Sequence, residues 1–204
     1  MRHRAFTVEG NLIDWTSSPV CTIIGAGATV VAEIAEHGIE GEVMTLNDST
    51  AYWHGPIHHA FSMHAREYMH HWLGLREARG RNAPAFVHSL LRDRMQVPKV
   101  QKTPGSWLEM DERFIGWEMA PDPGFTGVFA VYAALAMGFE KIRILGSDME
   151  GGHFWDMSLG GDVKFWQKFP EVRKCCQETL EPHRKRLWCP GKMLKKIFAR
   201  DNPK

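Results

Sequence analysis

Two glycine-containing segments stand before predicted helices, where backbone N–H groups without partners inside the helix favour an anion. In the first segment Gly25 and Gly27 lie two residues apart, and their missing side chains let a ligand approach the backbone closely. In the second, at residues 124–127, we expect Thr126 to cap the helix and, with Gly127, to hold a phosphate. The third glycine of a dinucleotide fingerprint is absent after Gly27, so a purely structural turn stays open there.

Polar side chains follow two of the predicted strands. Asn47 and Asp48 come directly after a strand predicted at 42–46, and Asp148 follows another at 141–145. Because the carboxyl ends of parallel strands meet at one edge of a sheet, we expect these residues to face a ligand there. Asn47 and Asp48 would orient a base or ribose, and Asp48 and Asp148 could hold Mg²⁺ if the reaction uses it. The same short side chains also make helix caps and turns, and that interpretation stays open.

Two histidines are candidates for acid–base chemistry, because an imidazole titrates near neutral pH. His64 follows a predicted strand and so points to the same sheet edge, and His153 lies shortly beyond Asp148. Histidine is also a common zinc ligand, and six of the eleven histidines lie close together in the sequence: His54, His58, His59, His64, His70 and His71. Their spacing matches no zinc motif, and we assign no metal site to them.

The elements that must position these residues form a regular pattern. A short apolar strand at 20–24, a helix at 30–36 and a second strand at 42–46 make a βαβ unit, which is typical of a parallel sheet. Further strands are predicted at 60–63, 141–145 and 186–189, and further helices at 65–79, 126–137, 163–180 and 192–199. We expect a single domain over residues 1–204, in which residues 80–123, with five prolines, form an irregular insertion or lid.

Composition places the chain among ordinary globular proteins. Of its 204 residues 44% are hydrophobic and 24% charged, which excludes a disordered chain or a disulfide scaffold. The net charge of +1 gives no field that attracts nucleic acid. No apolar run approaches the roughly 20 residues needed to cross a bilayer, so we predict neither nucleic acid nor membrane as a partner. The four cysteines show no C-x-x-C spacing, which is typical of reduced thiols in a cytoplasmic protein.

Three segments together resemble two related protein groups. They are IIGAGATV at 23–30, TLNDS at 45–49 and GFTGVFAVYAALAMGFEKIRILGSDM at 124–149. The pattern is similar to that of the bacterial sialyltransferases of glycosyltransferase family 42. It is also similar to that of the DUF115 group, which is related to the archaeal-type 6-hydroxymethylpterin diphosphokinases. Small phage-type members of the DUF115 group look most alike, through SMHAREYMHHWLGLREARG at 62–80 and SDMEGGHFWD at 147–156.

This resemblance implies a Rossmann-like, three-layer α/β/α fold with a mostly parallel sheet and a nucleotide or nucleotide-sugar donor. Thr126 and Gly127 stand where the sialyltransferases carry Ser-Gly near the nucleotide phosphates, and Gly25, Gly27 and the Asn47 region would face the nucleotide. We therefore expect a glycosyltransferase-like transferase that uses such a donor. Two alternatives stay open: a diphosphokinase-like enzyme that moves a pyrophosphoryl group from ATP, and a non-catalytic module that binds a nucleotide or a host protein. The oligomeric state is open as well.

Overall fold

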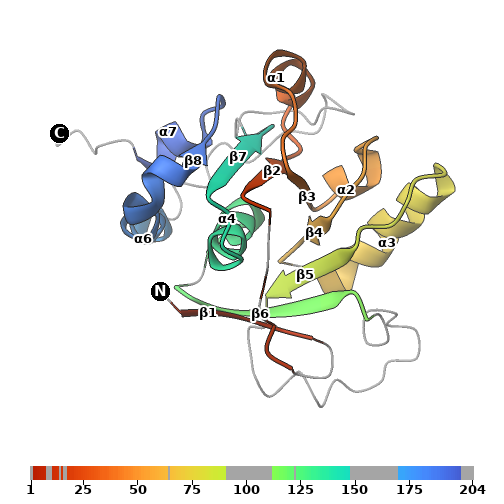
Figure 1. The fold of residues 1–204 in the computed structure, drawn as a ribbon, viewed down its shortest axis with the longest axis horizontal. Coiled ribbons are helices and arrows are strands. Elements are labelled where there is room, and N and C mark those ends of the chain that lie inside the picture. The colour runs from red at the N-terminus through yellow and green to blue at the C-terminus, as the bar shows by residue number, and fades with distance from the viewer. Residues whose placement is uncertain are drawn as a thin grey trace.

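The computed structural model describes residues 2–7, 11–13, 15, 18–63, 65–90, 112–121, 123–147 and 170–198. Within these residues eight strands form one sheet in the order β1-β6-β5-β4-β3-β2-β7-β8 (Figure 1). All neighbours are parallel except β1 and β6, which pair antiparallel at one edge. The strands are β1 (Arg2–Phe6), β2 (Val20–Ile24), β3 (Glu42–Leu46), β4 (His59–Phe61), β5 (Phe86–Leu90), β6 (Phe114–Ala120), β7 (Lys141–Leu145) and β8 (Leu187–Trp188).

Helices cover both faces of this sheet, as the resemblance implied. Side chains alternate along β2, so that Ile23 packs towards α4 while Ile24 packs towards α1. The helices α4, α6 and α7 share one core cluster, and α1 and α3 belong to two clusters built on the alternate strand residues. Their bounds are α1 (Val30–His37), α2 (Ser49–Tyr52), α3 (Ala65–Ala78), α4 (Thr126–Ala136), α6 (Pro170–Leu180) and α7 (Met193–Ile197), with a 3-10 helix η3 (Glu181–Arg186) before β8.

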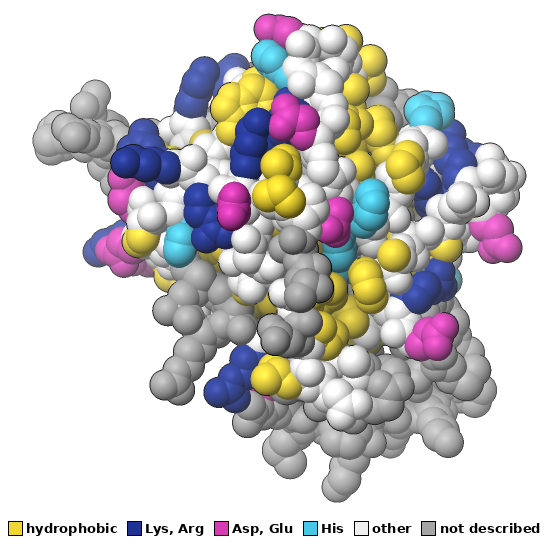
Figure 2. Space-filling view, in the orientation of Figure 1, with side chains coloured by type: hydrophobic (Ala, Val, Ile, Leu, Met, Phe, Trp, Pro, Cys, Tyr) yellow, Lys and Arg dark blue, Asp and Glu magenta, His cyan; other side chains and the backbone are white. Residues whose placement is uncertain are grey.

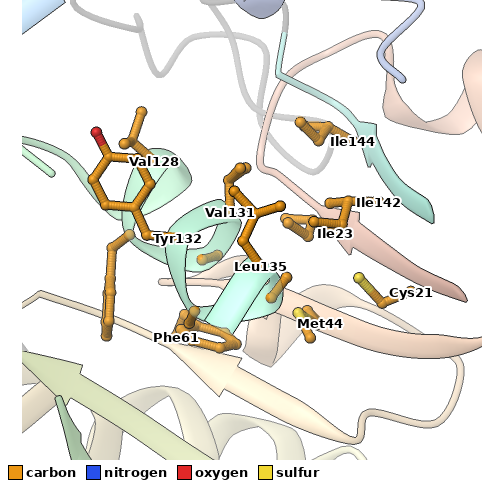
Figure 3. Packing of buried hydrophobic residues seen from close by; sticks show 14 of the residues in the cluster. Cys21, Ile23, Met44, Phe61, Val128, Val131, Tyr132, Leu135, Ile142 and Ile144 are labelled. Carbon is orange, nitrogen blue, oxygen red and sulfur yellow. The ribbon is translucent and has the colours of Figure 1, made fainter. Parts of the chain in front are cut away.

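Helix α4 is the centre of the larger core. Every residue from Thr126 to Leu135 is buried, because the helix is apolar all round and lies against the middle of the sheet. Figure 3 shows Val131 and Leu135 of α4 among Ile23, Met44 and Ile142 from three neighbouring strands. The helix ends at Gly138, whose φ of 93° is a left-handed conformation that glycine adopts without strain. The predicted helix, buried on most sides, is thus confirmed.

The strands β2, β3 and β7 begin and end where the sequence predicted them, and β4 lies one to two residues earlier than expected. Three elements were not predicted: β1, whose residues RHRAF are mostly polar, the four-residue helix α2 and the 3-10 helix η3. The segment 80–123 contributes β5 and β6 to the sheet itself, and residues 91–111 lie outside the described part of the chain, so a lid there stays a prediction. None of the helices among the described residues is both long and apolar enough to span a bilayer.

Candidate functional site

The predicted binding residues that the structure describes lie at the carboxyl edge of the sheet. The Ser49 hydroxyl links the ends of β2 and β3, because it donates to the Ile24 carbonyl at 3.0 Å and accepts from the Leu46 N–H at 2.9 Å. The end of β2 is joined to that of β7, since the Gly25 N–H donates to the Leu145 carbonyl at 2.8 Å. From β2 the chain adds strands β3 to β6 in one direction across the sheet, and it then adds β7 on the other side of β2. Ligands of open α/β sheets bind beside such a switch point, which here lies between β2 and β7.

The first glycine turn is packed tightly against the end of β7. The Gly27 N–H donates to the Gly146 carbonyl at 2.8 Å, so this group is not available to a phosphate. A Cβ at Gly25 would stand 2.4 Å from the same carbonyl oxygen, which leaves no room for any side chain. These contacts favour the structural interpretation of the turn. What Gly25 and Gly27 can still offer a ligand is close approach, not N–H donors.

Glu33, which the sequence analysis did not identify, is a buried side chain that stabilises the contact between the first glycine turn and the end of β7. The Gly146 N–H donates to Glu33 Oε2 at 2.8 Å, and the Thr29 hydroxyl donates to Glu33 Oε1 at 2.7 Å. Gly146 itself has a φ of 64° and lies so close to Val30 that a Cβ would be 2.6 Å from the Val30 Cβ. The Thr-x-x-x-Glu spacing at the start of α1 was the only sequence signal for this role.

The first turn of α4 differs from the prediction in its cap. Phe125, with an extended backbone, holds the cap position, and its side chain makes no capping hydrogen bond. Thr126 is instead the first helical residue, and its hydroxyl donates to Asn47 Oδ1 at 3.3 Å. Gly127 is required by packing, since a Cβ there would lie 2.9 Å from the Phe125 ring. The first N–H groups of α4 have no partner within the helix, and they open beside the end of β3.

Asn47 holds a backbone conformation that only a few non-glycine residues adopt. Its φ is 49°, and it is the only described non-glycine residue with a positive φ. The conformation is fixed on both sides, because the Asn47 N–H donates to the Phe61 carbonyl at 2.8 Å and its carbonyl accepts from the Thr50 N–H at 3.1 Å. With Oδ1 engaged by Thr126, the Nδ2 donors find no acceptor among the described residues. Backbone strain of this kind clusters at ligand-binding sites.

Two arginines that looked like ordinary surface residues in the sequence hold the loop after Asn47. Arg76 is 1% exposed, and its guanidinium donates to the carbonyls of Trp53 and Gly55, both at 2.7 Å. Arg81 donates to the carbonyl of Ala51 at 3.0 Å and also to those of Tyr52 and Trp53. With the Arg76 bond to the Thr50 carbonyl at 3.2 Å, six bonds to backbone oxygens fix α2 and its end. Through this four-residue helix they also fix the segment that carries Asn47 and Asp48.

The remaining predicted site residues lie partly outside the described part of the chain. His64, His153 and Asp148 belong to this group, and their proposed roles stay predictions. Asp48 is described and stands at the cap position of α2 without capping it by its side chain. Among the described residues no group of three or more His, Cys, Asp or Glu side chains could hold a metal ion.

The histidines that are close in sequence serve separate contacts. His54 Nδ1 bonds Arg81 at 3.1 Å, and His58 Nδ1 accepts the Val43 N–H at 3.0 Å. His59 begins β4 and bonds the carboxylate of Glu42 at 2.8 Å. Nearness in sequence therefore does not gather these three imidazoles around one point.

No protein-family model matches the chain, and no curated protein matches its sequence. Its fold is similar to that of the sialyltransferase CstII from Campylobacter jejuni. The structure of CstII in complex with the substrate analogue CMP-3FNeuAc has a TM-score of 0.55 and 12% sequence identity, over 85% of this chain and 82% of CstII. The structure of CST-II with a trisaccharide acceptor and CMP has a TM-score of 0.53 and 14% identity, over 87% and 84%.

At such identities the likeness establishes the architecture. The expected resemblance to the sialyltransferases is confirmed as a structural similarity, and the DUF115 group and a phage origin find no support in a family model. The chain therefore has the Rossmann-like α/β fold that CstII has, with a mostly parallel sheet of eight strands among its described residues.

Proposed function

We propose that this chain is a glycosyltransferase-like transferase that takes its donor from a nucleotide-activated sugar. The observation that supports this most is the junction of Asn47 and Thr126. A strained asparagine at the end of β3 contacts the first turn of a helix whose N-terminus no side chain caps. The N–H groups of the first helical turn, which have no partner within the helix, and the positive end of the helix dipole attract a phosphate. The Nδ2 group of Asn47 can donate a hydrogen bond to a polar group of the ligand.

In this proposal each residue has a limited task. The first turn of α4 holds the phosphate, and the Thr126 hydroxyl joins it by turning its single proton from Asn47 Oδ1 to the phosphate. Asn47 and Asp48 orient the base or ribose. Gly25, Gly27 and Gly127 keep side chains away from the ligand. His64 or His153 supplies acid–base chemistry near neutral pH. Catalysis then consists mainly of positioning the donor and stabilising charge on the leaving phosphate.

The first donor to test is a cytidine monophosphate sugar. CstII structures contain CMP or the analogue CMP-3FNeuAc, and the fold of this chain is similar to theirs. A nucleoside monophosphate leaving group carries a single phosphate, which matches a site built on one uncapped helix terminus. This arrangement needs no cluster of metal ligands, and none is found among the described residues.

The test is a calorimetric titration with CMP, UMP, AMP, GMP, ADP, ATP and a CMP sugar, with and without Mg²⁺. We expect one monophosphate to bind without Mg²⁺. Thr126→Val should weaken its affinity about ten-fold, because one hydrogen bond to a charged group is lost, whereas Thr126→Ser should bind like the wild type.

Asn47→Gly is the second variant, since glycine accepts the positive φ and only the amide is removed. It should bind more weakly while folding normally. If neither Thr126→Val nor Asn47→Gly changes the affinity, the proposed site is wrong. Binding of ADP or ATP that requires Mg²⁺ would instead favour the diphosphokinase-like alternative, and binding of a CMP sugar without its hydrolysis or transfer would favour the non-catalytic one.

A further inference from the structure

A hydrogen-bond network of buried side chains crosses four strands away from the proposed site. The Trp117 Nε1–H donates to His88 Nδ1 at 2.9 Å, His88 Nε2 lies 2.9 Å from His59 Nδ1, and His59 Nε2 lies 2.8 Å from Glu42 Oε2. We call these four residues the His59–His88 network. His88 is fully buried and His59 is 2% exposed, whereas Glu42 reaches the surface. The carboxylate therefore forms the outer end of the network.

The position of every proton in this network follows from its inner end. An indole N–H can only donate, so His88 Nδ1 must accept. A neutral imidazole has one donor and one acceptor nitrogen, so His88 Nε2 carries a proton and donates to His59 Nδ1. By the same argument His59 Nε2 carries a proton and donates to the Glu42 carboxylate. Three protons fill three hydrogen bonds, all running in one direction.

A further proton has no place in this arrangement. A protonated His88 would turn an Nδ1–H towards the Trp117 N–H. A protonated His59 would force His88 into the other tautomer, with the same conflict at Trp117. A protonated Glu42 would carry its proton on one of two oxygens and so weaken the bond which that oxygen accepts, from His59 or from the Ser18 N–H at 3.1 Å. A proton on either histidine therefore breaks the bond at Trp117, and a proton on Glu42 weakens a bond at the outer end.

Both ends of the network contact the segment that leads into β2. The Trp15 ring stacks on Trp117 with centroids 6.4 Å apart and an interplanar angle of 4°. It also lies 5.9 Å from the centroids of His59 and His88, and thus covers the network from outside the sheet. The Trp15 Nε1–H is buried, and no described residue accepts a hydrogen bond from it, so Trp15 depends on ring packing alone.

The surroundings keep the network uncharged except at Glu42. Burial lowers the pKa of His88 well below its usual value, and the neighbouring His59 adds to this. Burial also lowers the pKa of His59, although Glu42 opposes the effect. The other titratable groups that face the network are His58 and, beside Glu42, Cys21, which Arg186 influences in turn. Helix α4, on the same face of the sheet, carries no acidic or basic side chain.

The network is not a path for protons to a reaction, because its inner end is an indole that cannot release one. We propose that the His59–His88 network is an acid-sensitive latch, in which uptake of a proton releases Trp15 and Ser18 from the sheet. At neutral pH the network is complete and the segment is held at both contacts. In acid the bond at Trp117, on which the Trp15 ring packs, opens, or the bonds at Glu42, which holds the Ser18 N–H, weaken. The latch is independent of the proposed transferase function.

One test is carried out on the wild type by nitrogen-resolved NMR of the histidine side chains. We expect both His59 and His88 to carry their proton on Nε2 at pH 7.5. When pH falls, the signal of a fluorinated Trp15, assigned through Trp15→Phe, should shift together with the protonation of His59 or His88. A proton on Nδ1 of either histidine at pH 7.5, or protonation that leaves the Trp15 signal unchanged, would overturn the proposal.

The second test reproduces the added proton at neutral pH. Glu42→Gln leaves one acceptor oxygen for two donors, so the Ser18 N–H loses its partner or the network must reverse. We expect exchange of the Ser18 amide at pH 7.5 to rise about ten-fold, the effect of one lost hydrogen bond. The control is Glu40→Gln, which removes a carboxylate bound to Lys141 and Arg143 and outside the network. Equal exchange at Ser18 in both variants, together with a Trp15 signal in Glu42→Gln that is unchanged from the wild type, would contradict the latch.

Discussion

The Glu33 carboxylate accepts the Gly146 N–H at 2.8 Å and thereby joins the first turn of α1 to the residue that follows β7. Both groups are buried, and the second carboxylate oxygen is occupied by the Thr29 hydroxyl. The turn at Gly25 and Gly27 rests on the same residue, Gly146. One acidic side chain thus holds together two of the loops at the carboxyl edge of the sheet.

Replacing Glu33 should therefore destabilise the protein. In Glu33→Ala the buried Gly146 N–H has no acceptor, which should lower the free energy of unfolding by about 1–3 kcal/mol. Glu33→Gln keeps one acceptor oxygen and should cost less. Urea unfolding measures both, with Glu36→Ala as the control, since Glu36 is exposed on the same helix. Equal stability of Glu33→Ala and Glu36→Ala would show that the bond contributes nothing.

Alanine substitutions at two glycines with similar φ compare the cost of backbone strain alone with the cost of strain and steric crowding together. A Cβ added at Gly38 (φ 66°, ψ −175°) would meet no atom within 4 Å, so Gly38→Ala should cost about 1–3 kcal/mol through its backbone conformation alone. Gly146 has a similar φ of 64°, and its Cβ would in addition stand 2.6 Å from that of Val30. Gly146→Ala should therefore cost more than Gly38→Ala, about 2–5 kcal/mol in total. If urea unfolding gave similar losses in the free energy of unfolding for the two variants, the residues around Gly146 would be able to move and accommodate the added Cβ.

Arg76 should be more important for stability than its sequence context suggests. Arg76→Lys cannot reproduce the fork that reaches the Trp53 and Gly55 carbonyls, and we expect a loss of about 2–3 kcal/mol in the free energy of unfolding. Arg79→Lys is the matched control, because Arg79 directly follows α3, is exposed and lies over the Tyr52 ring. Comparable losses for the two variants would contradict this role of Arg76.

Stability should depend on pH through the two buried histidines. Their folded-state pKa values lie below the usual value of 6.5, so the unfolded chain takes up protons first as pH falls. Stability should be constant above about pH 6.5 and decrease below it by up to about 2.7 kcal/mol per pH unit for these two protons. His183, whose pKa burial also lowers, adds to the decrease. Urea unfolding between pH 8 and 5 measures this. Glu42, whose pKa the His59 hydrogen bond lowers, adds a loss only below its unfolded-state value of about 4.5.

His70→Gln and His71→Gln serve as controls for this profile. Both residues are exposed on α3 and should leave the decrease below pH 6.5 unchanged. A flat profile between pH 6.5 and 5 in the wild type would show that His59 and His88 take up protons as easily in the folded protein as in the unfolded chain.

The central part of the fold could be predicted because local signals agree there. The strands at 20–24, 42–46 and 141–145 are apolar runs between turn residues, and α4 is an uninterrupted apolar helix. The strand β1 carries no such pattern, because it lies at the edge of the sheet and pairs only with β6. Its presence depends on a partner more than a hundred residues away, which local sequence cannot indicate.

The candidate site was predictable in position but not in its contacts. That Asn47 and Thr126 belong to one edge follows from strand order, yet the bond between them and the open cap of α4 depend on packing. For the histidines, nearness in sequence was misleading about contacts. His58 and His59 are adjacent, but the partner of His59 is His88, 29 residues further on. Surface charges of both signs are interspersed in Figure 2, so charge alone marks no binding face there.

The enclosure of α4 on all sides has a consequence for anything that meets its first turn. A helix without a solvent-exposed face cannot shift or fray when a ligand binds, because each movement would open a void in the core. The donors at its beginning are oriented once, when the protein folds, and need no reordering afterwards. Recognition at this place should accordingly be selective for shape, and substitutions deep in the helix should alter it from a distance.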